Sequence, residues 1–118
     1  MARFVLLEHE WNGIHYDLMI ERDGSLKTWS LDSNVEARRE IPARPRADHR
    51  VIYLDYEGPV AGDRGTVRCL ARGSYRVEQW SSSRIILAIV SPQLNGELRL
   101  TEDGDGGWTF AFFPGNVD

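Results

Sequence analysis

The chain has 118 residues, of which 42% are hydrophobic and 27% charged, and this composition is typical of one soluble globular domain spanning residues 1–118. Its net charge of −4 argues against strong non-specific binding along a nucleic-acid duplex, which depends on many phosphate contacts. No apolar run approaches the roughly 20 residues that cross a bilayer, and the single cysteine and the absence of a signal peptide's apolar core indicate a cytoplasmic protein.

Short segments separated by turn residues run through almost the whole chain. We predict strands at residues 3–9, 15–21, 25–31, 65–70, 74–80, 84–90, 97–102 and 108–113. Residues 32–47 contain two prolines and little periodicity, which predicts a loop with room for a helical turn around residues 34–40. Residues 49–56 form a further apolar run. About eight short strands at intervals of roughly 8–12 residues indicate an all-β fold, either a sandwich or a barrel.

Two of the three histidines lie close to a carboxylate near the N-terminus. His15 and Asp17 have the same parity in a predicted strand, so their side chains point to the same face. His9 lies before the turn signal Asn12-Gly13, and a turn there lets His9 fold back to meet the pair. Two imidazoles and one carboxylate suit Mn²⁺, Zn²⁺, Fe²⁺ or Ni²⁺. The spacing alone leaves open a hydrogen-bonded pair without a metal.

Several short segments form an ordered series along the chain. They are Arg3-Phe4-Val5-Leu6-Leu7-Glu8-His9, His15-Tyr16-Asp17-Leu18, Gly24-Ser25-Leu26-Lys27-Thr28-Trp29, Asp48-His49, Tyr53-Leu54-Asp55-Tyr56-Glu57-Gly58, Gly65-Thr66-Val67 and Arg72-Gly73-Ser74-Tyr75. The series resembles the 3′-phosphoesterase domain of bacterial and archaeal DNA end-joining ligases (ligase D), and the chain looks like a small free-standing member. The resemblance implies a compact single-domain antiparallel β-barrel of about eight short strands, with a short helical turn or loop between strands.

The resemblance also implies roles for individual residues. His9, His15 and Asp17 match the metal ligands, and the metal implied is Mn²⁺, with Zn²⁺ or another transition metal as the alternative. His49 matches a histidine that contacts the phosphate and is a candidate acid for the leaving oxygen. Tyr53 matches a tyrosine that completes that pocket. Taken without the resemblance, His49 and Tyr53 read more simply as packing residues.

Two positions depart from the family's pattern. The family has an arginine two residues after the metal-binding aspartate and a glutamate two residues before the third histidine, where this chain has Met19 and Ala47. Arg44, Arg46 and Arg50 surround that histidine in sequence and are candidates for the missing phosphate-binding guanidinium, because arginine binds phosphate in a bidentate way. A solvated arginine-rich loop is the alternative reading of these three residues.

The leading functional hypothesis is a metal-dependent phosphoesterase or ribonuclease that heals broken DNA 3′ ends for end-joining repair. It would remove a 3′-phosphate or a terminal ribonucleotide, with a nucleic-acid 3′ end as substrate and a DNA ligase or end-joining protein as partner. The alternative is a non-catalytic β-barrel that binds a nucleic-acid end or a repair partner, which Met19 and Ala47 favour. A third hypothesis is a small metal hydrolase that acts on a free phosphoester.

We expect mainly structural roles for the four tryptophans and the cysteine. Trp11, Trp29, Trp80 and Trp108 are surfaces on which bases can stack, but they are spread through the chain, so most are expected in the core. Cys69 lies in a predicted strand and is expected to be a small wall residue rather than a nucleophile.

Overall fold

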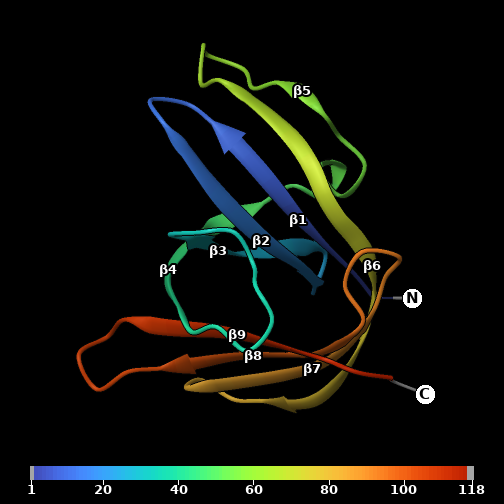
Figure 1. Cartoon of the computed structure of the whole chain (residues 1–118). Coiled ribbons are helices and arrows are strands. Elements are labelled where there is room, and N and C mark those ends of the chain that lie inside the picture. The colour runs from blue at the N-terminus through green and yellow to red at the C-terminus, as the bar shows by residue number, and fades with distance from the viewer. Residues whose placement is uncertain (1, 117–118) are drawn as a thin grey trace.

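The computed structural model describes residues 2–116 and consists largely of antiparallel strands (Figure 1). Nine strands lie within this range: β1 Arg3–Glu10, β2 Ile14–Arg22, β3 Ser25–Leu31, β4 Ile41–His49, β5 Gly58–Pro59, β6 Thr66–Trp80, β7 Arg84–Val90, β8 Gly96–Glu102 and β9 Trp108–Pro114. A 3₁₀-helix, η1 Val51–Leu54, lies between β4 and β5. Within the same range, no helix has the length and apolar character needed to cross a membrane.

All the described strands belong to one sheet, in the order β1-β2-β3-β4-β9-β8-β7-β6-β5. Because β1 also pairs with β6, eight of them close into a ring, and β5 pairs with the start of β6. The long strand β6 pairs with β1 over its first part and with β7 over its second part. The all-β antiparallel fold predicted from the sequence is therefore confirmed, with the sheet arranged as a ring.

The segment after β3 differs from the prediction. Residues 41–49 form strand β4, whereas the sequence predicted a loop over residues 32–47. β4 pairs with β3 through most of its length but with β9 only over residues 41–43, so its second half has a free edge. Proline lacks the N–H that an inner strand needs and is tolerated at such an edge, which accounts for Pro45. Residues 34–40 form the predicted loop without the helical turn for which the sequence left room, and Ala37 forms an isolated bridge with Phe112.

Two other boundaries also differ from the prediction. The apolar run at residues 49–56 becomes the end of β4 and the helix η1. The two strands predicted at residues 65–70 and 74–80 are one continuous strand. Gly73 lies inside that strand, and a Cβ atom there would lie 2.1 Å from the carbonyl oxygen of Val90. This glycine therefore marks close packing between β6 and the end of β7 rather than a turn.

Strands β1 and β2 bury apolar side chains on both faces. Leu18 and Ile20 belong to the main core, which collects residues from eight of the described strands and so fills the inside of the ring. Residues of the opposite parity belong to a smaller outer cluster, formed by Val5, Leu7, Met19, Leu26, Leu54 and Val67. Leu54 comes from η1, so the segment after β4 covers the outer face of these strands. Cys69 packs against this cluster, and burial raises the pKa of its thiol, as expected of a wall residue.

We predict that Leu54→Ala lowers the free energy of unfolding by about 2–5 kcal/mol, the range for large-to-small changes in a packed cluster. Leu54 is 3% exposed and is the buried residue of η1. Val51→Ala is the matched control, because Val51 begins the same helix and is 40% exposed; its effect should be within about 0.5 kcal/mol. Urea-induced unfolding measures both variants, and equal losses would contradict the role of Leu54 in holding η1 against the sheet.

Candidate functional site

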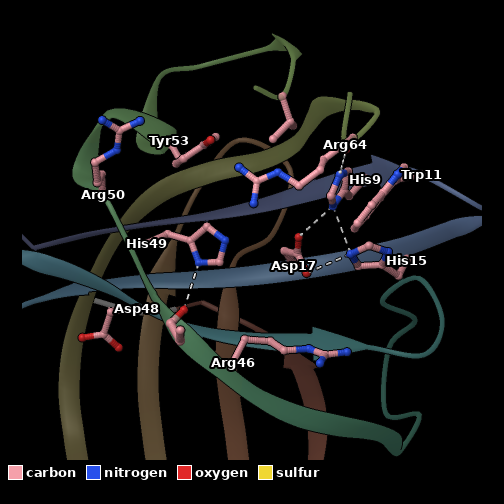
Figure 2. A pocket seen from close by; sticks show the side chains of 12 residues that line it. His9, Trp11, His15, Asp17, Arg46, Asp48, His49, Arg50, Tyr53 and Arg64 are labelled. Atoms are coloured by element: carbon pink, nitrogen blue, oxygen red, sulfur yellow. Dashed lines mark hydrogen bonds and ion pairs between the residues drawn. The ribbon is translucent and has the colours of Figure 1, made fainter. Parts of the chain in front are cut away.

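Three side chains of metal-ligand type meet where β1 turns into β2. The turn is tight: the N–H of Trp11 donates to the carbonyl of Gly13 at 2.8 Å, and Gly13 has a φ of +111°, which glycine adopts without strain. This turn pairs His9 directly with His15 across the two strands. Asp17 lies two residues further along β2 and so faces the same side. The structure thus brings His9, His15 and Asp17 together on the outer face of the ring (Figure 2).

The separations within this group suit ligands of one ion. His9 Nδ1 lies 3.1 Å from His15 Nε2 and 3.6 Å from Asp17 Oδ2. His15 Nε2 lies 3.5 Å from Asp17 Oδ1. Atoms bonded at about 2.0–2.2 Å to one metal, at tetrahedral or octahedral angles, lie about 2.8–3.6 Å from each other. The observed separations fall in this range when each imidazole is measured to its nearer carboxylate oxygen, and one donor atom from each residue lies within 4.8 Å of the others, so the group is compatible with a single divalent transition metal.

Asp17 is nearly buried and has imidazoles as its ion-pair partners. It is 6% exposed. Across residues 2–116, its ion-pair partners are His9 and His15, and no lysine or arginine side chain pairs with it. Burying a carboxylate without a full positive charge beside it is costly. The two imidazoles and the buried carboxylate therefore form a site whose charge a divalent ion would complete.

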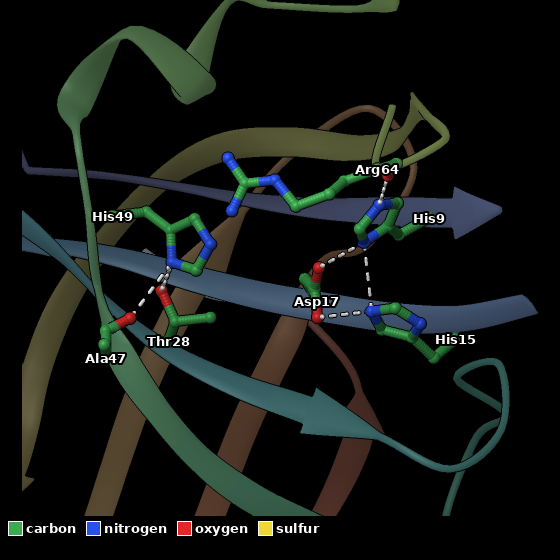
Figure 3. Close-up of polar contacts among 7 residues, drawn as sticks. All are labelled: His9, His15, Asp17, Thr28, Ala47, His49 and Arg64. Atoms are coloured by element: carbon green, nitrogen blue, oxygen red, sulfur yellow. Dashed lines mark hydrogen bonds and ion pairs between the residues drawn. The ribbon is translucent and has the colours of Figure 1, made fainter. Parts of the chain in front are cut away.

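The backbone of Arg64 orients the first histidine. His9 Nε2 lies 2.7 Å from the carbonyl oxygen of Arg64 (Figure 3). A carbonyl only accepts hydrogen bonds, so Nε2 carries the proton. In the neutral ring, Nδ1 then directs its lone pair towards His15 and Asp17, which is the state that a metal ligand needs. Arg64 is a site residue that the sequence analysis missed.

Gly65 explains how Arg64 reaches this position. A Cβ atom on Gly65 would lie 1.8 Å from the carbonyl oxygen of Glu10 and 2.8 Å from the Cβ of Trp11. The N–H of Val60 donates to the carbonyl of Gly65 at 2.8 Å and closes the loop between β5 and β6. Only glycine allows this loop to lie so close to the end of β1. The Gly65-Thr66-Val67 motif was the sequence signal at this position, but the motif alone did not show that the loop contacts His9.

His49, at the end of β4, has one ring nitrogen fixed by the protein. Its Nδ1 lies 3.0 Å from the carbonyl oxygen of Ala47 and 3.0 Å from Oγ1 of Thr28. The hydroxyl of Thr28 donates to the carbonyl of Leu26, so both neighbours accept from His49 and Nδ1 carries the proton. No hydrogen bond from the described residues reaches Nε2, which faces the pocket (Figure 3). Buried Thr28 is a second residue that the sequence analysis missed.

One pocket of about 590 Å³ joins these groups. Its lining includes the three members of the histidine–aspartate group, together with His49, Tyr53, Arg46, Arg50 and Arg64. Figure 2 shows the histidine–aspartate group on one side of the pocket and His49 with Tyr53 on the other. The rings of Tyr53 and His49 pack edge to face, with centres 5.7 Å apart. The pocket therefore has room for a phosphate group between a candidate metal centre and a histidine.

Arginines give the pocket its positive charge. The guanidinium groups of Arg46, Arg50 and Arg64 form no ion pair within residues 2–116, and all three residues line the pocket. Arg46 pairs with Thr28 and His49 pairs with Leu26, and the register shift between these two pairs places Arg46 and His49 on the same side of β4. Arg44 was expected in the same role, but it pairs with Asp32 at 3.4 Å and lies outside the pocket lining.

The carboxylate next to His49 is engaged elsewhere. Asp48 Oδ2 accepts hydrogen bonds from Lys27 Nζ and Ser25 Oγ, each at 2.8 Å. These bonds, with that of Lys27 the stronger cause, hold the pKa of Asp48 below its usual range. Asp48 therefore stays ionised near neutral pH and does not act as a proton donor in the pocket.

Comparison with known proteins identifies the family. A sequence model of the DNA ligase D 3′-phosphoesterase domain matches residues 7–102, a range that contains every histidine of the chain. The chain belongs to this family. The family match includes the candidate metal ligands, His49, Tyr53 and the loop that carries Arg64.

Named relatives support this membership. The chain is 25% identical over 114 residues to the multifunctional non-homologous end joining protein LigD of Mycobacterium bovis, a match that covers 89% of this chain. It is 27% identical over 125 residues to LigD of Mycolicibacterium smegmatis, covering 90% of this chain. A match to LigD of Pseudomonas aeruginosa is 29% identical over 62 residues and covers 51% of this chain. The chain spans only 15% and 16% of the length of the two mycobacterial relatives.

The packing of Gly65 against β1 can be tested with Gly62 as a matched control. Both glycines have a φ of +77°, so alanine bears similar left-handed strain at either position, about 1–2 kcal/mol. At Gly62 the nearest atom to an added Cβ is Arg64 Nε at 3.7 Å, whereas Gly65 meets backbone. We predict that Gly65→Ala destabilises the protein more than Gly62→Ala and breaks the bond between His9 Nε2 and the Arg64 carbonyl.

Urea-induced unfolding measures the difference in stability. The ¹⁵N chemical shifts of the His9 ring report which nitrogen carries the proton. If the two variants lose equal stability and His9 keeps its Nε2 proton in both, the proposed packing role of Gly65 is wrong.

Proposed function

We propose that this chain is a metal-dependent phosphoesterase that removes a 3′-phosphate or a terminal ribonucleotide from a nucleic-acid 3′ end. The observation that carries this proposal is the pocket shared by a histidine–aspartate group, a histidine with a free Nε2 and three arginines. Membership of the ligase D phosphoesterase family supports a role in healing DNA ends for end joining. A DNA ligase or another end-joining protein is the expected partner, since the relatives' names include non-homologous end joining.

The candidate metal ligands are His9 Nδ1, His15 Nε2 and a carboxylate oxygen of Asp17. Mn²⁺ is the metal that we propose first, with Zn²⁺ or another transition metal as the alternative, because imidazole and carboxylate together suit these ions. When bound, such an ion polarises a P–O bond and neutralises the negative charge that develops on the phosphoryl oxygens. The carbonyl of Arg64 supports this role, since its bond to His9 Nε2 orients the ring so that Nδ1 faces His15 and Asp17.

The remaining groups of the pocket act on the phosphate and the leaving group. His49 Nε2 is free of protein partners in the described chain; when both ring nitrogens carry a proton, Nε2 would donate its proton to the leaving oxygen, while Ala47 and Thr28 hold the ring in place. The hydroxyl of Tyr53 would donate a hydrogen bond to a phosphate oxygen. Arg46, Arg50 and Arg64 line the pocket, and guanidinium groups bind phosphate oxygens in a bidentate way. The positive charge that the family pattern has at residue 19 would thus come from other elements of the fold.

The alternative is a non-catalytic module that binds a nucleic-acid end. Met19 favours it, because the position where the family has an arginine is here buried in the outer cluster beside Leu26 and Leu54. Met19→Arg would place a charge among apolar side chains and is expected to destabilise the protein rather than restore phosphate binding. A measurement of turnover in the wild-type protein therefore distinguishes the two functions, whereas the Met19→Arg variant does not.

We predict that His15→Ala abolishes Mn²⁺ binding and cleavage, whereas His49→Ala keeps the metal affinity and lowers turnover by about 10²–10⁴-fold, the usual contribution of a general acid. The two variants form a matched pair, since both remove an imidazole from the same pocket. Isothermal titration with Mn²⁺ and Zn²⁺ measures metal affinity. Cleavage of a 5′-labelled primer-template that ends in one ribonucleotide, or in a 3′-phosphate, measures turnover.

The binding-module alternative predicts a different result. Wild-type protein would then give no product with any divalent metal, and end binding would survive His49→Ala with only a modest loss. Absence of product across the metal series, from folded and metal-loaded protein, would remove the enzymatic function. Loss of Mn²⁺ binding in His49→Ala would contradict the division of roles between the two histidines.

A further inference from the structure

Trp11 differs from the other tryptophans of the chain. Trp29 and Trp108 are buried in the main core and pack edge to face against each other. Trp80 lies beneath the guanidinium of Arg22, whose carbon is 4.1 Å from its ring centre. Trp11 is 43% exposed and lines the candidate pocket. Packing in the core explains the first two and a cation–π contact explains the third, but neither explains Trp11.

The position of Trp11 is fixed on two sides. Its ring lies nearly parallel to the imidazole of His9, with ring centres 6.1 Å apart and an angle of 21° between the planes. Its backbone N–H is bonded to the carbonyl of Gly13, and Gly65 packs against its Cβ. Figure 2 shows Trp11 beside His9, on the side of the pocket away from His49. An indole is therefore held at the rim of the pocket, next to the candidate metal ligands.

We propose that Trp11 is the surface on which the terminal base of an unpaired 3′ end stacks. This inference rests on the proposed function, and it adds how the substrate is held: the protein contacts the base of the terminal nucleotide as well as its phosphate. A phosphate bound between His49 and the histidine–aspartate group leaves its attached nucleoside at the rim of the pocket. Every base has a π face that can stack on an indole, so stacking there does not select one sequence.

The charge of the protein supports the same assignment. The chain has a net charge of −4, and a long series of phosphate contacts is therefore not available to hold the substrate. The three pocket arginines supply positive charge only around the reacting phosphate. Stacking on Trp11 provides affinity that does not depend on further phosphates. A base that stacks on Trp11 has left its partner strand, so the preferred end is single-stranded or frayed.

The test is equilibrium binding of two matched oligonucleotides to wild-type protein and to Trp11→Ala in the presence of Mn²⁺. Both oligonucleotides are single-stranded, carry a 5′ fluorophore and end in a non-hydrolysable 3′-phosphonate; one has a terminal base and the other has an abasic terminal nucleotide. We expect the wild type to bind the base-bearing end about 10-fold more tightly, in line with the usual strength of base–aromatic stacking. We expect Trp11→Ala to bind both ends with equal affinity.

Two further variants control for structural effects. Trp11→Phe keeps an aromatic face and should retain most of the preference. Ile14→Ala removes an exposed apolar side chain from the same end of β2, outside the pocket lining, and should retain all of it. The affinity of Trp11→Ala for Mn²⁺ should match that of the wild type, which shows that the neighbouring His9 is unchanged. If Trp11→Ala does not fold, the comparison of the two ends on wild type and Trp11→Phe still tests the proposal.

Equal binding of both ends by the wild type overturns the proposal, as does a preference that persists in Trp11→Ala or a lack of binding to either end. Because no turnover is needed, failure of this inference is distinct from failure of the proposed function. Cleavage without a base preference would retain the phosphoesterase and remove the stacking role. A base preference without cleavage would retain the stacking role in a protein that only binds ends.

Discussion

The register between β1 and β2 is the constraint on which both the core and the candidate site depend. Side chains alternate between the faces of a strand, so a shift of one residue would exchange the two faces completely. In the observed register, Leu18 and Ile20 fill the inside of the ring, whereas His15 and Asp17 lie outside beside His9. The apolar side chains that stabilise the ring therefore also decide which face carries the polar group. Correct pairing of these two strands is therefore enough to place His9, His15 and Asp17 together.

The outer face becomes a site only because other segments cover it. Helix η1 packs Leu54 onto the outer cluster, and the loop before β6 brings Arg64 onto His9. Their combined effect is that Asp17 is nearly inaccessible although it lies outside the ring. Electrostatic interactions are stronger where water is excluded, so this cover strengthens the interaction of the carboxylate with any bound cation. His49 lies across the same pocket from this group (Figure 2).

The sequence predicted the features that depend on local pattern. Alternating side chains identified most strands. The shared parity of His15 and Asp17, together with the turn signal before them, predicted that His9 lies near both. The sequence failed where tertiary contacts replace local pattern. β4 carries proline and arginine along a free edge, so it has no apolar period to recognise. Arg64 acts on His9 through a backbone carbonyl across 55 positions, and such a contact leaves no trace in residue type.

The placement of the site on the outer face has a consequence for how the protein can change. The inside of the ring and the outer face draw on alternate residues of the same strands, so one face can be rewritten without repacking the other. Met19 illustrates this, because an apolar side chain occupies a position where the family pattern has a charged one, while Leu18 and Ile20 on either side remain in the ring. The architecture thus separates the residues that keep the fold from those that set its chemistry, and a designer could alter substrate preference by editing only the outward-facing residues of β1 to β4.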